Sequence, residues 1–228
     1  MRFDQTLTLV ASDAVCVECN TGWMSTLGGR VIEDVRAAIF GLSIALTPAR
    51  AQVLATWATE RAMLFELALK VAREGWFAPE SNLRWIYAHR TDPIPPPACQ
   101  VWMAYVDATT ALPAWSATGS WPDGQEKPEG YISCFSLGCV VFMVSGQDFR
   151  EPDHVTFDGR PLARIELPSR YSGYVVPIWP DPNELVVWPP RFGVPSKGLS
   201  AFGNLADAVV RRPVLGPPVH RAPPGQDA

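Results

Sequence analysis

Two cysteines and an asparagine near the start of the chain carry the side chains best suited to metal chemistry. Cys16 and Cys19 are separated by two residues, and Asn20 follows directly. Thiolates at this spacing are typical zinc ligands, and a structural zinc is usually held by four Cys or His side chains in a tetrahedron. The motif therefore predicts half of a zinc site, with Cys16 and Cys19 as its ligands. The alternative interpretation is a pair of reduced thiols beside a turn.

The other cysteines are candidates for the second half of that site. Cys134 and Cys139 could complete the tetrahedron, but both lie in apolar segments typical of strands. Because free cysteine is usually buried in protein cores, we expect both to be core thiols. Cys99, which follows three prolines and an alanine, is expected to begin a strand. His154 has no partner near it in sequence and is expected to be a loop residue, neither a base nor a ligand.

Helices are predicted to position the motif. We expect Asn20 to cap a helix whose apolar residues recur at helical spacing up to Ile39. Thr47 and Pro48, a capping residue followed by proline, predict the start of a long helix that ends near Gly75. A shorter helix is predicted over residues 79–89, and a half-buried strand over residues 6–10.

The second half of the chain has a different residue pattern from the first. Short runs rich in Val, Tyr, Trp and Phe, divided by Gly and Pro, predict strands at residues 99–106, 131–137, 139–144 and 174–179. Helices followed by strands predict an α+β fold: a partial zinc-knuckle element and long helices, then an antiparallel β-rich region. The expected division is a knuckle with its helix (1–45), a helical segment (46–92), the β-rich region (93–210) and a disordered tail (211–228).

Composition narrows the class of protein. A length of 228 residues with 47% hydrophobic residues is enough for one compact core. The net charge of -4 argues against a broadly basic, DNA-coating surface. An odd number of cysteines, five, fits a reducing compartment, and no apolar stretch is long enough to span a membrane. The sequence thus predicts a soluble, cytoplasmic protein.

The run Cys-x-x-Cys-Asn-x-Gly-Trp-Met-Ser at residues 16–25 resembles the second half of the ββα-metal site in the HNH endonuclease superfamily. The similarity to bacterial and phage HNH-like proteins extends to a Trp-Ala helix start at Trp57, and to Trp-Pro endings at Trp179 and Trp188. This resemblance implies a nuclease family that cleaves phosphodiesters, with DNA as its partner. It further implies a structural zinc on Cys16 and Cys19, and a catalytic Mg²⁺ or Mn²⁺ on Asn20.

The chain departs from that family upstream of the motif. The family's first knuckle and its Glu-His general base precede this position, yet the fifteen residues before Cys16 contain neither Cys nor His. Gly28 also stands where relatives usually have an acidic residue. We therefore expect no catalytic residue in this chain, which would be either an N-terminally truncated nuclease or a degenerate, inactive member.

Two further interpretations remain open at this stage. One is a non-catalytic module that binds zinc and a protein or nucleic acid, with a homodimer completing the zinc site. The other is an unrelated small-molecule enzyme, but the sequence has no Gly-rich phosphate loop, Ser-His-Asp order or paired-carboxylate motif to support it.

Overall fold

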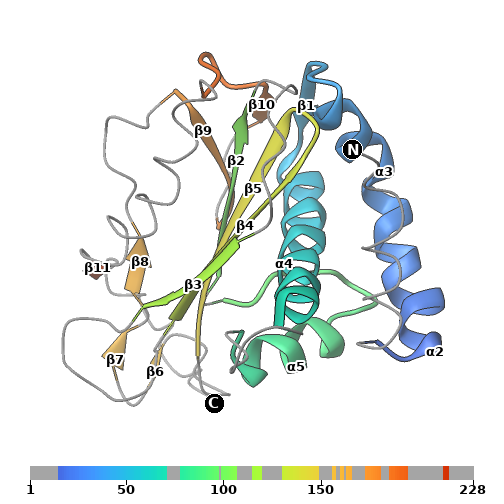
Figure 1. Cartoon of the computed structure of the whole chain (residues 1–228), viewed down its shortest axis with the longest axis vertical. Coiled ribbons are helices and arrows are strands. Elements are labelled where there is room, and N and C mark those ends of the chain that lie inside the picture. The colour runs from blue at the N-terminus through green and yellow to red at the C-terminus, as the bar shows by residue number, and fades with distance from the viewer. Residues whose placement is uncertain are drawn as a thin grey trace, which may run out of the picture.

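The computed structural model describes residues 15–70, 78–97, 99–106, 115–119, 130–148, 156–157, 160–161, 163–165, 173–180, 185–194 and 213–215. In this part of the chain, helices cover one face of an antiparallel sheet, which confirms the predicted α+β fold. The sheet, helix α4 and helix α3 follow one another as layers (Figure 1). The predicted strand at residues 6–10 and the predicted helix end near Gly75 lie outside the described residues.

The main sheet has five strands in the order β3-β4-β5-β2-β9, and all neighbours are antiparallel. Its members are β2 (Gln100–Tyr105), β3 (Trp115–Gly119), β4 (Gly130–Leu137), β5 (Val140–Gln147) and β9 (Val175–Trp179). The four strands predicted from sequence correspond to β2, β4, β5 and β9. Strand β5 is buried along its whole length, as expected for the central strand.

Smaller pairs of strands surround the main sheet. Strand β1 (Ile44–Leu46) pairs with β10 (Val186–Trp188), β6 (Thr156–Phe157) with β7 (Arg160–Pro161), and β8 (Ala163–Ile165) with β11 (Pro213–Leu215). Strand β11 is the only described part of the range 211–228 that was expected to be a disordered tail. The two Trp-Pro bonds of the motif endings, Trp179-Pro180 and Trp188-Pro189, are both cis.

The helical layer begins with α2 (Val17–Cys19), a π-helical turn (Asn20–Met24) and α3 (Ser25–Ile39). The prediction that Asn20 caps this helix is wrong. Cys16 is the capping residue, because its backbone is extended and its Sγ accepts the Cys19 N–H at 3.3 Å, whereas Asn20 is already helical. The helical backbone therefore starts at Val17, and a kink at Gly22 (φ -91°, ψ -107°) separates this first turn from α3.

Helix α4 (Pro48–Lys70) lies between the sheet and α3 and is buried on nearly every side over residues 54–60. Its predicted start is confirmed, since Thr47 Oγ1 accepts the Arg50 N–H at 3.4 Å and Pro48 is the first helical residue. Trp57 anchors α4 on the sheet through Phe142, with ring centroids 5.6 Å apart. The predicted third helix is α5 (Glu80–Ala88).

An ion pair fixes α3 against the start of α4. Asp34 lies within the apolar stripe of α3 and is 5% exposed. Both of its oxygens accept hydrogen bonds from Arg50, and the same guanidinium donates to the Ala45 carbonyl at 3.2 Å. The helical arm that carries the cysteine motif, from α2 to the end of α3, is therefore held by a charged contact as well as by apolar packing.

No helix in the described ranges is long and apolar enough to cross a membrane.

Candidate metal centre

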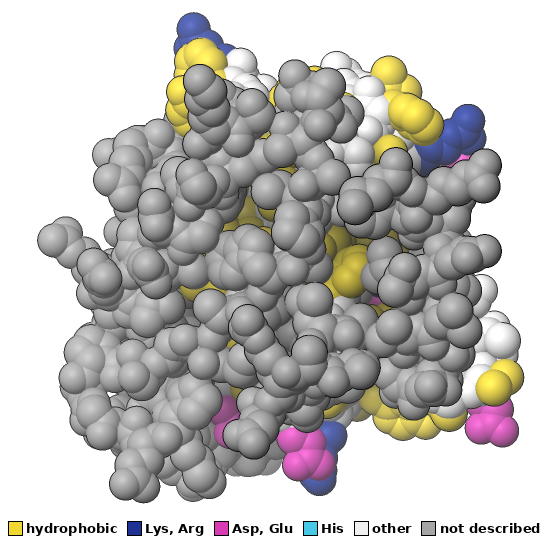
Figure 2. All heavy atoms as spheres, viewed as in Figure 1, with side chains coloured by type: hydrophobic (Ala, Val, Ile, Leu, Met, Phe, Trp, Pro, Cys, Tyr) yellow, Lys and Arg dark blue, Asp and Glu magenta, His cyan; other side chains and the backbone are white. Residues whose placement is uncertain are grey.

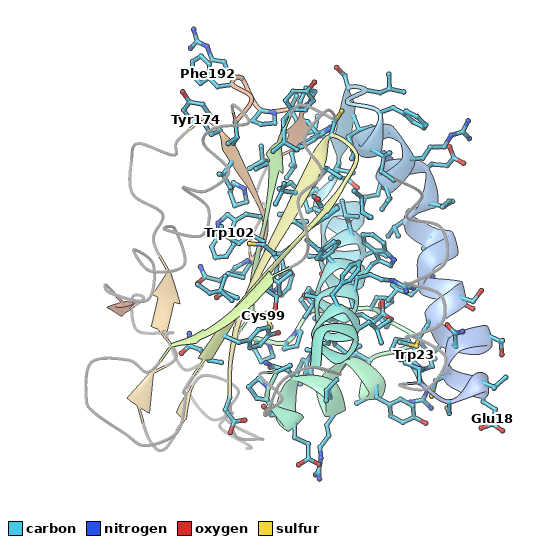
Figure 3. All side chains as sticks on the ribbon, in the orientation of Figure 1. Glu18, Trp23, Cys99, Trp102, Tyr174 and Phe192 are labelled. Carbon is cyan, nitrogen blue, oxygen red and sulfur yellow. The ribbon has the colours of Figure 1, made fainter. Side chains whose placement is uncertain are left out.

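The two motif cysteines lie at the outer end of the helical arm, where α2 turns into α3 (Figure 1). Cys16 is exposed, and Cys19 is half-buried one turn later. Figure 3 shows Glu18, between them, at the edge of the molecule, whereas Trp23 turns toward the interior. The thiol pair is therefore accessible from solvent, on a short helical turn that has no buried residue.

The two thiols differ in their readiness to ionise. Hydrogen bonds from the side chain of Cys19, and then from its backbone N–H, lower the pKa of Cys16. The same side-chain interaction raises the pKa of Cys19. Because the thiolate is the form that binds metal and attacks electrophiles, Cys16 is the more reactive member of the pair.

Trp23 supplies a polar group beside Cys19. Its indole Nε1 is buried and forms no hydrogen bond of normal geometry within the described residues, yet it lies near enough to Cys19 to lower the pKa of that thiol. Buried N–H groups usually have a partner, and metal-bound sulfur commonly accepts such a hydrogen bond. The indole N–H is thus a donor suited to a metal-bound Cys19 sulfur.

Asn20 lies on the same turn as the two thiols, but no cluster of metal-ligand side chains joins it among the described residues. It is exposed, and its backbone N–H donates to the Cys16 carbonyl at 3.0 Å. Across the described residues, no group of three or more His, Cys, Asp or Glu side chains could hold a metal ion. The arrangement therefore brings Cys16, Cys19 and Asn20 together, and offers two soft ligands on one turn.

The remaining cysteines are buried in or beside the sheet: Cys134 and Cys139 are buried thiols, as predicted, and Cys99 lies directly before β2, close to its predicted place at a strand start. Cys99, Cys134 and Cys139 are all buried, and burial raises the pKa of Cys99 to about 12 and that of Cys134 still further. Figure 3 shows Cys99 on the sheet, across α4 from the motif. The Cys139 N–H donates to the carbonyl of Ile39, at the opposite end of α3, a helix about 22 Å long. These thiols do not complete the site in this fold.

A small basic and aromatic rim lies beside the motif. The Trp23 ring meets Tyr87 of α5 edge to face, with centroids 6.4 Å apart, and the Arg90 guanidinium lies 4.4 Å from the centre of the Tyr87 ring. Arg30 reaches the same place by donating to the Thr91 carbonyl at 3.4 Å. Arg30, Tyr87 and Arg90 are exposed, and we call them the motif rim.

Besides Asp34, sequence reasoning missed a second buried acid. Glu60 lies in the middle of α4 and is 3% exposed, and neither carboxyl oxygen forms a hydrogen bond within the described residues. Arg61 Nε lies 3.0 Å from Oε2, without hydrogen-bond geometry. The sequence pattern that could have revealed Glu60 is a carboxylate within an apolar helical run. His89, by contrast, has a structural role, with its ring stacked on Trp85 and Nδ1 2.9 Å from the Trp85 carbonyl. His154 lies outside the described residues.

No protein-family model matches this chain, and no curated protein or solved structure matches it either.

Proposed function

We propose that this chain is a zinc-binding, HNH-endonuclease-like protein in which Cys16 and Cys19 form half of a thiolate zinc site. One observation carries the proposal: the two thiols lie one turn apart at an exposed helix start, with a backbone N–H donated to the first sulfur. This is the donor set that zinc prefers, and hydrogen bonds to sulfur stabilise the thiolate form that a metal needs.

The ligand count indicates how the site is completed. Each chain offers two thiolates, and a tetrahedral structural zinc requires four ligands. No third ligand lies beside the pair within the described residues, and the exposed position of Cys16 leaves room for a second chain. Two copies related by a two-fold axis would supply four thiolates to one zinc. The proposal therefore includes a homodimer bridged by about one zinc per two chains.

Sedimentation velocity in reducing buffer, with and without added Zn²⁺, tests this assembly. The wild-type chain should become dimeric when zinc is added and return to the monomer with a chelator. The Cys16→Ser/Cys19→Ser variant should stay monomeric. Val17→Ser, which changes an exposed residue of the same turn, is the matched control and should behave as wild type. A zinc-dependent dimer of the double-cysteine variant would contradict the proposal.

The second part of the proposal is that this chain does not cut DNA. Asn20 could contribute one oxygen to Mg²⁺ or Mn²⁺, which would supply charge neutralisation at a phosphodiester. A general base is still required, and the histidine that serves as base in the HNH family has no counterpart in the fifteen residues before Cys16. Duplex and single-stranded DNA should remain intact with Mg²⁺, Mn²⁺ or Ni²⁺. Cleavage that is lost in Asn20→Ala would refute inactivity and would imply a base supplied from elsewhere.

A nucleic-acid-binding module is the second candidate, favoured by the motif rim. Arg30 and Arg90 present two exposed guanidinium groups next to the aromatic ring of Tyr87. The described Lys and Arg side chains that can be seen in Figure 2 lie at its margins. The motif rim provides two guanidinium groups, so its contact with phosphates would be local. Such a contact would bind a short stretch of backbone without broad electrostatic attraction.

DNA binding measured over a range of salt concentrations tests this candidate. Arg30→Ala/Arg90→Ala should weaken binding and reduce the salt slope by about two, because each phosphate contact contributes close to one. Arg84→Ala is the matched control, since Arg84 is an exposed arginine of α5 that pairs with Glu80 at 2.7 Å. Equal affinity and slope in all three proteins would exclude the rim as a nucleic-acid contact.

A further inference from the structure

An apolar groove lies between α3, α4 and the end of strand β4. It has a volume of about 340 Å³. Its walls come from three elements: Ile32 from α3, Trp57 and Phe65 from α4, and Phe135 from β4. The Phe65 and Phe135 rings lie 5.0 Å apart, which gives the groove a continuous aromatic wall. Its volume is at the lower end of those of small-molecule sites.

The groove has one charged residue in its lining, Arg61. The Arg61 guanidinium lies 5.9 Å from the centre of the Trp57 ring and is about a third exposed. Its Nε faces Glu60, but its two terminal nitrogens have no hydrogen-bond partner in the described part of the chain. A guanidinium has a planar fork of donors that fits a carboxylate.

An acidic neighbour does not satisfy this arginine. Glu60 is buried, neither of its oxygens forms a hydrogen bond among the described residues, and Oε2 lies 3.0 Å from Arg61 Nε without hydrogen-bond geometry. The two terminal nitrogens of Arg61 therefore remain available to a ligand bound in the groove. An apolar site with one cation at its wall is complementary to an apolar molecule with one acidic group.

We propose that the groove between α3 and α4 binds a medium-chain fatty acid, whose alkyl chain lies along the wall of Trp57, Phe65 and Phe135 and whose carboxylate pairs with Arg61. The bound chain would cover Ile32, which is 56% exposed. The apolar walls provide affinity, because burial of an alkyl chain removes its apolar surface from water, and Arg61 selects the acid.

Two adjacent glycines of α3 allow a matched test. Gly28 lines the groove, and a Cβ there would meet no atom within 4 Å. Gly29 has equally open space but does not line the groove. Leucine has a higher helix propensity than glycine, so both variants should fold. Only Gly28→Leu would extend a side chain into the groove.

Calorimetric titration with decanoate and with decanol measures the binding. Decanoate should bind wild type and Gly29→Leu equally, and should not bind Gly28→Leu. Arg61→Met should weaken decanoate binding at least about tenfold and leave decanol binding unchanged, because a charge-assisted hydrogen bond is lost. Zinc binding by Cys16 and Cys19 should be the same in all these variants, which separates this proposal from the proposed function.

The other outcomes of these titrations would overturn the proposal or one of its parts. Absence of decanoate binding to wild type, or equal binding by Gly28→Leu and Gly29→Leu, would overturn the assignment of the groove. Equal loss of decanoate and decanol binding in Arg61→Met would overturn the role of the guanidinium and make the ligand a neutral apolar molecule.

Discussion

The buried acid Glu60 should make the stability of the protein depend on pH. Burial raises the pKa of this carboxyl from 4.5 to about 7, and the neighbouring Arg61 charge offsets part of that rise. Arg61 is the one charged group that acts on it in the described residues, because the facing parts of α3 and the sheet are mainly apolar. The folded protein therefore keeps a proton that the unfolded chain releases.

The sign of the effect follows from proton binding. Between pH 4.5 and about 7 the folded state binds more protons than the unfolded state, so the free energy of unfolding falls as pH rises. At about 1.4 kcal/mol per pH unit, the interval between the two pKa values corresponds to a loss of about 3 kcal/mol. Glu60→Gln should remove this loss, because glutamine stays neutral at every pH in the window.

Urea unfolding followed by tryptophan fluorescence, from about pH 4 to about pH 9, measures the difference between the two proteins. Other titrating groups contribute equally to both and cancel. The stability of wild type relative to Glu60→Gln should fall by about 3 kcal/mol across the window. Glu80→Gln, at an exposed and ion-paired glutamate of α5, should follow wild type. Parallel curves for wild type and Glu60→Gln would refute the raised pKa and the reasoning that leads to it.

Two further predictions concern the ion pair and the thiols. Arg50→Met should lower the free energy of unfolding by about 3 kcal/mol, because it leaves the buried Asp34 carboxylate without its partner. Asp34→Asn should lower it clearly less, because half of the Arg50 side chain is exposed and water can solvate it. Equal losses of the two variants in urea unfolding would contradict this difference. Brief iodoacetamide treatment of the folded protein, read by peptide mass spectrometry, should modify Cys16 first and leave Cys99 and Cys134 intact, since burial keeps these two protonated and inaccessible; early labelling of Cys99 would show that the core opens.

Much of the fold could be predicted from local patterns. Thr47 and Pro48 mark the start of α4 because capping and the missing proline N–H act within one turn. Four of the five strands of the main sheet were predicted, because apolar runs of five or more residues between Gly and Pro favour strands. Strand β3 is as long as β9 but was not predicted, since its sequence contains few apolar residues. Strands β1 and β10 were not predicted either, since three residues carry too little pattern and their pairing joins positions far apart in sequence.

Only those features of the candidate site that depend on residues close together in sequence could be predicted. The spacing of Cys16 and Cys19 indicated a pair of ligands on one turn. The capping role was assigned to Asn20 because asparagine is a common cap, but the sulfur of Cys16 accepts the backbone N–H in its place. Glu60 was missed, because its burial depends on how α4 packs between α3 and the sheet.

The zinc content of protein purified in reducing buffer, measured by plasma emission, tests the central claim most directly. The account predicts about one zinc per two chains in wild type and in Val17→Ser, and none in Cys16→Ser/Cys19→Ser. Zinc that persists in the double-cysteine variant, or its absence from wild type after incubation with excess Zn²⁺, would contradict the assignment of this pair as a metal half-site.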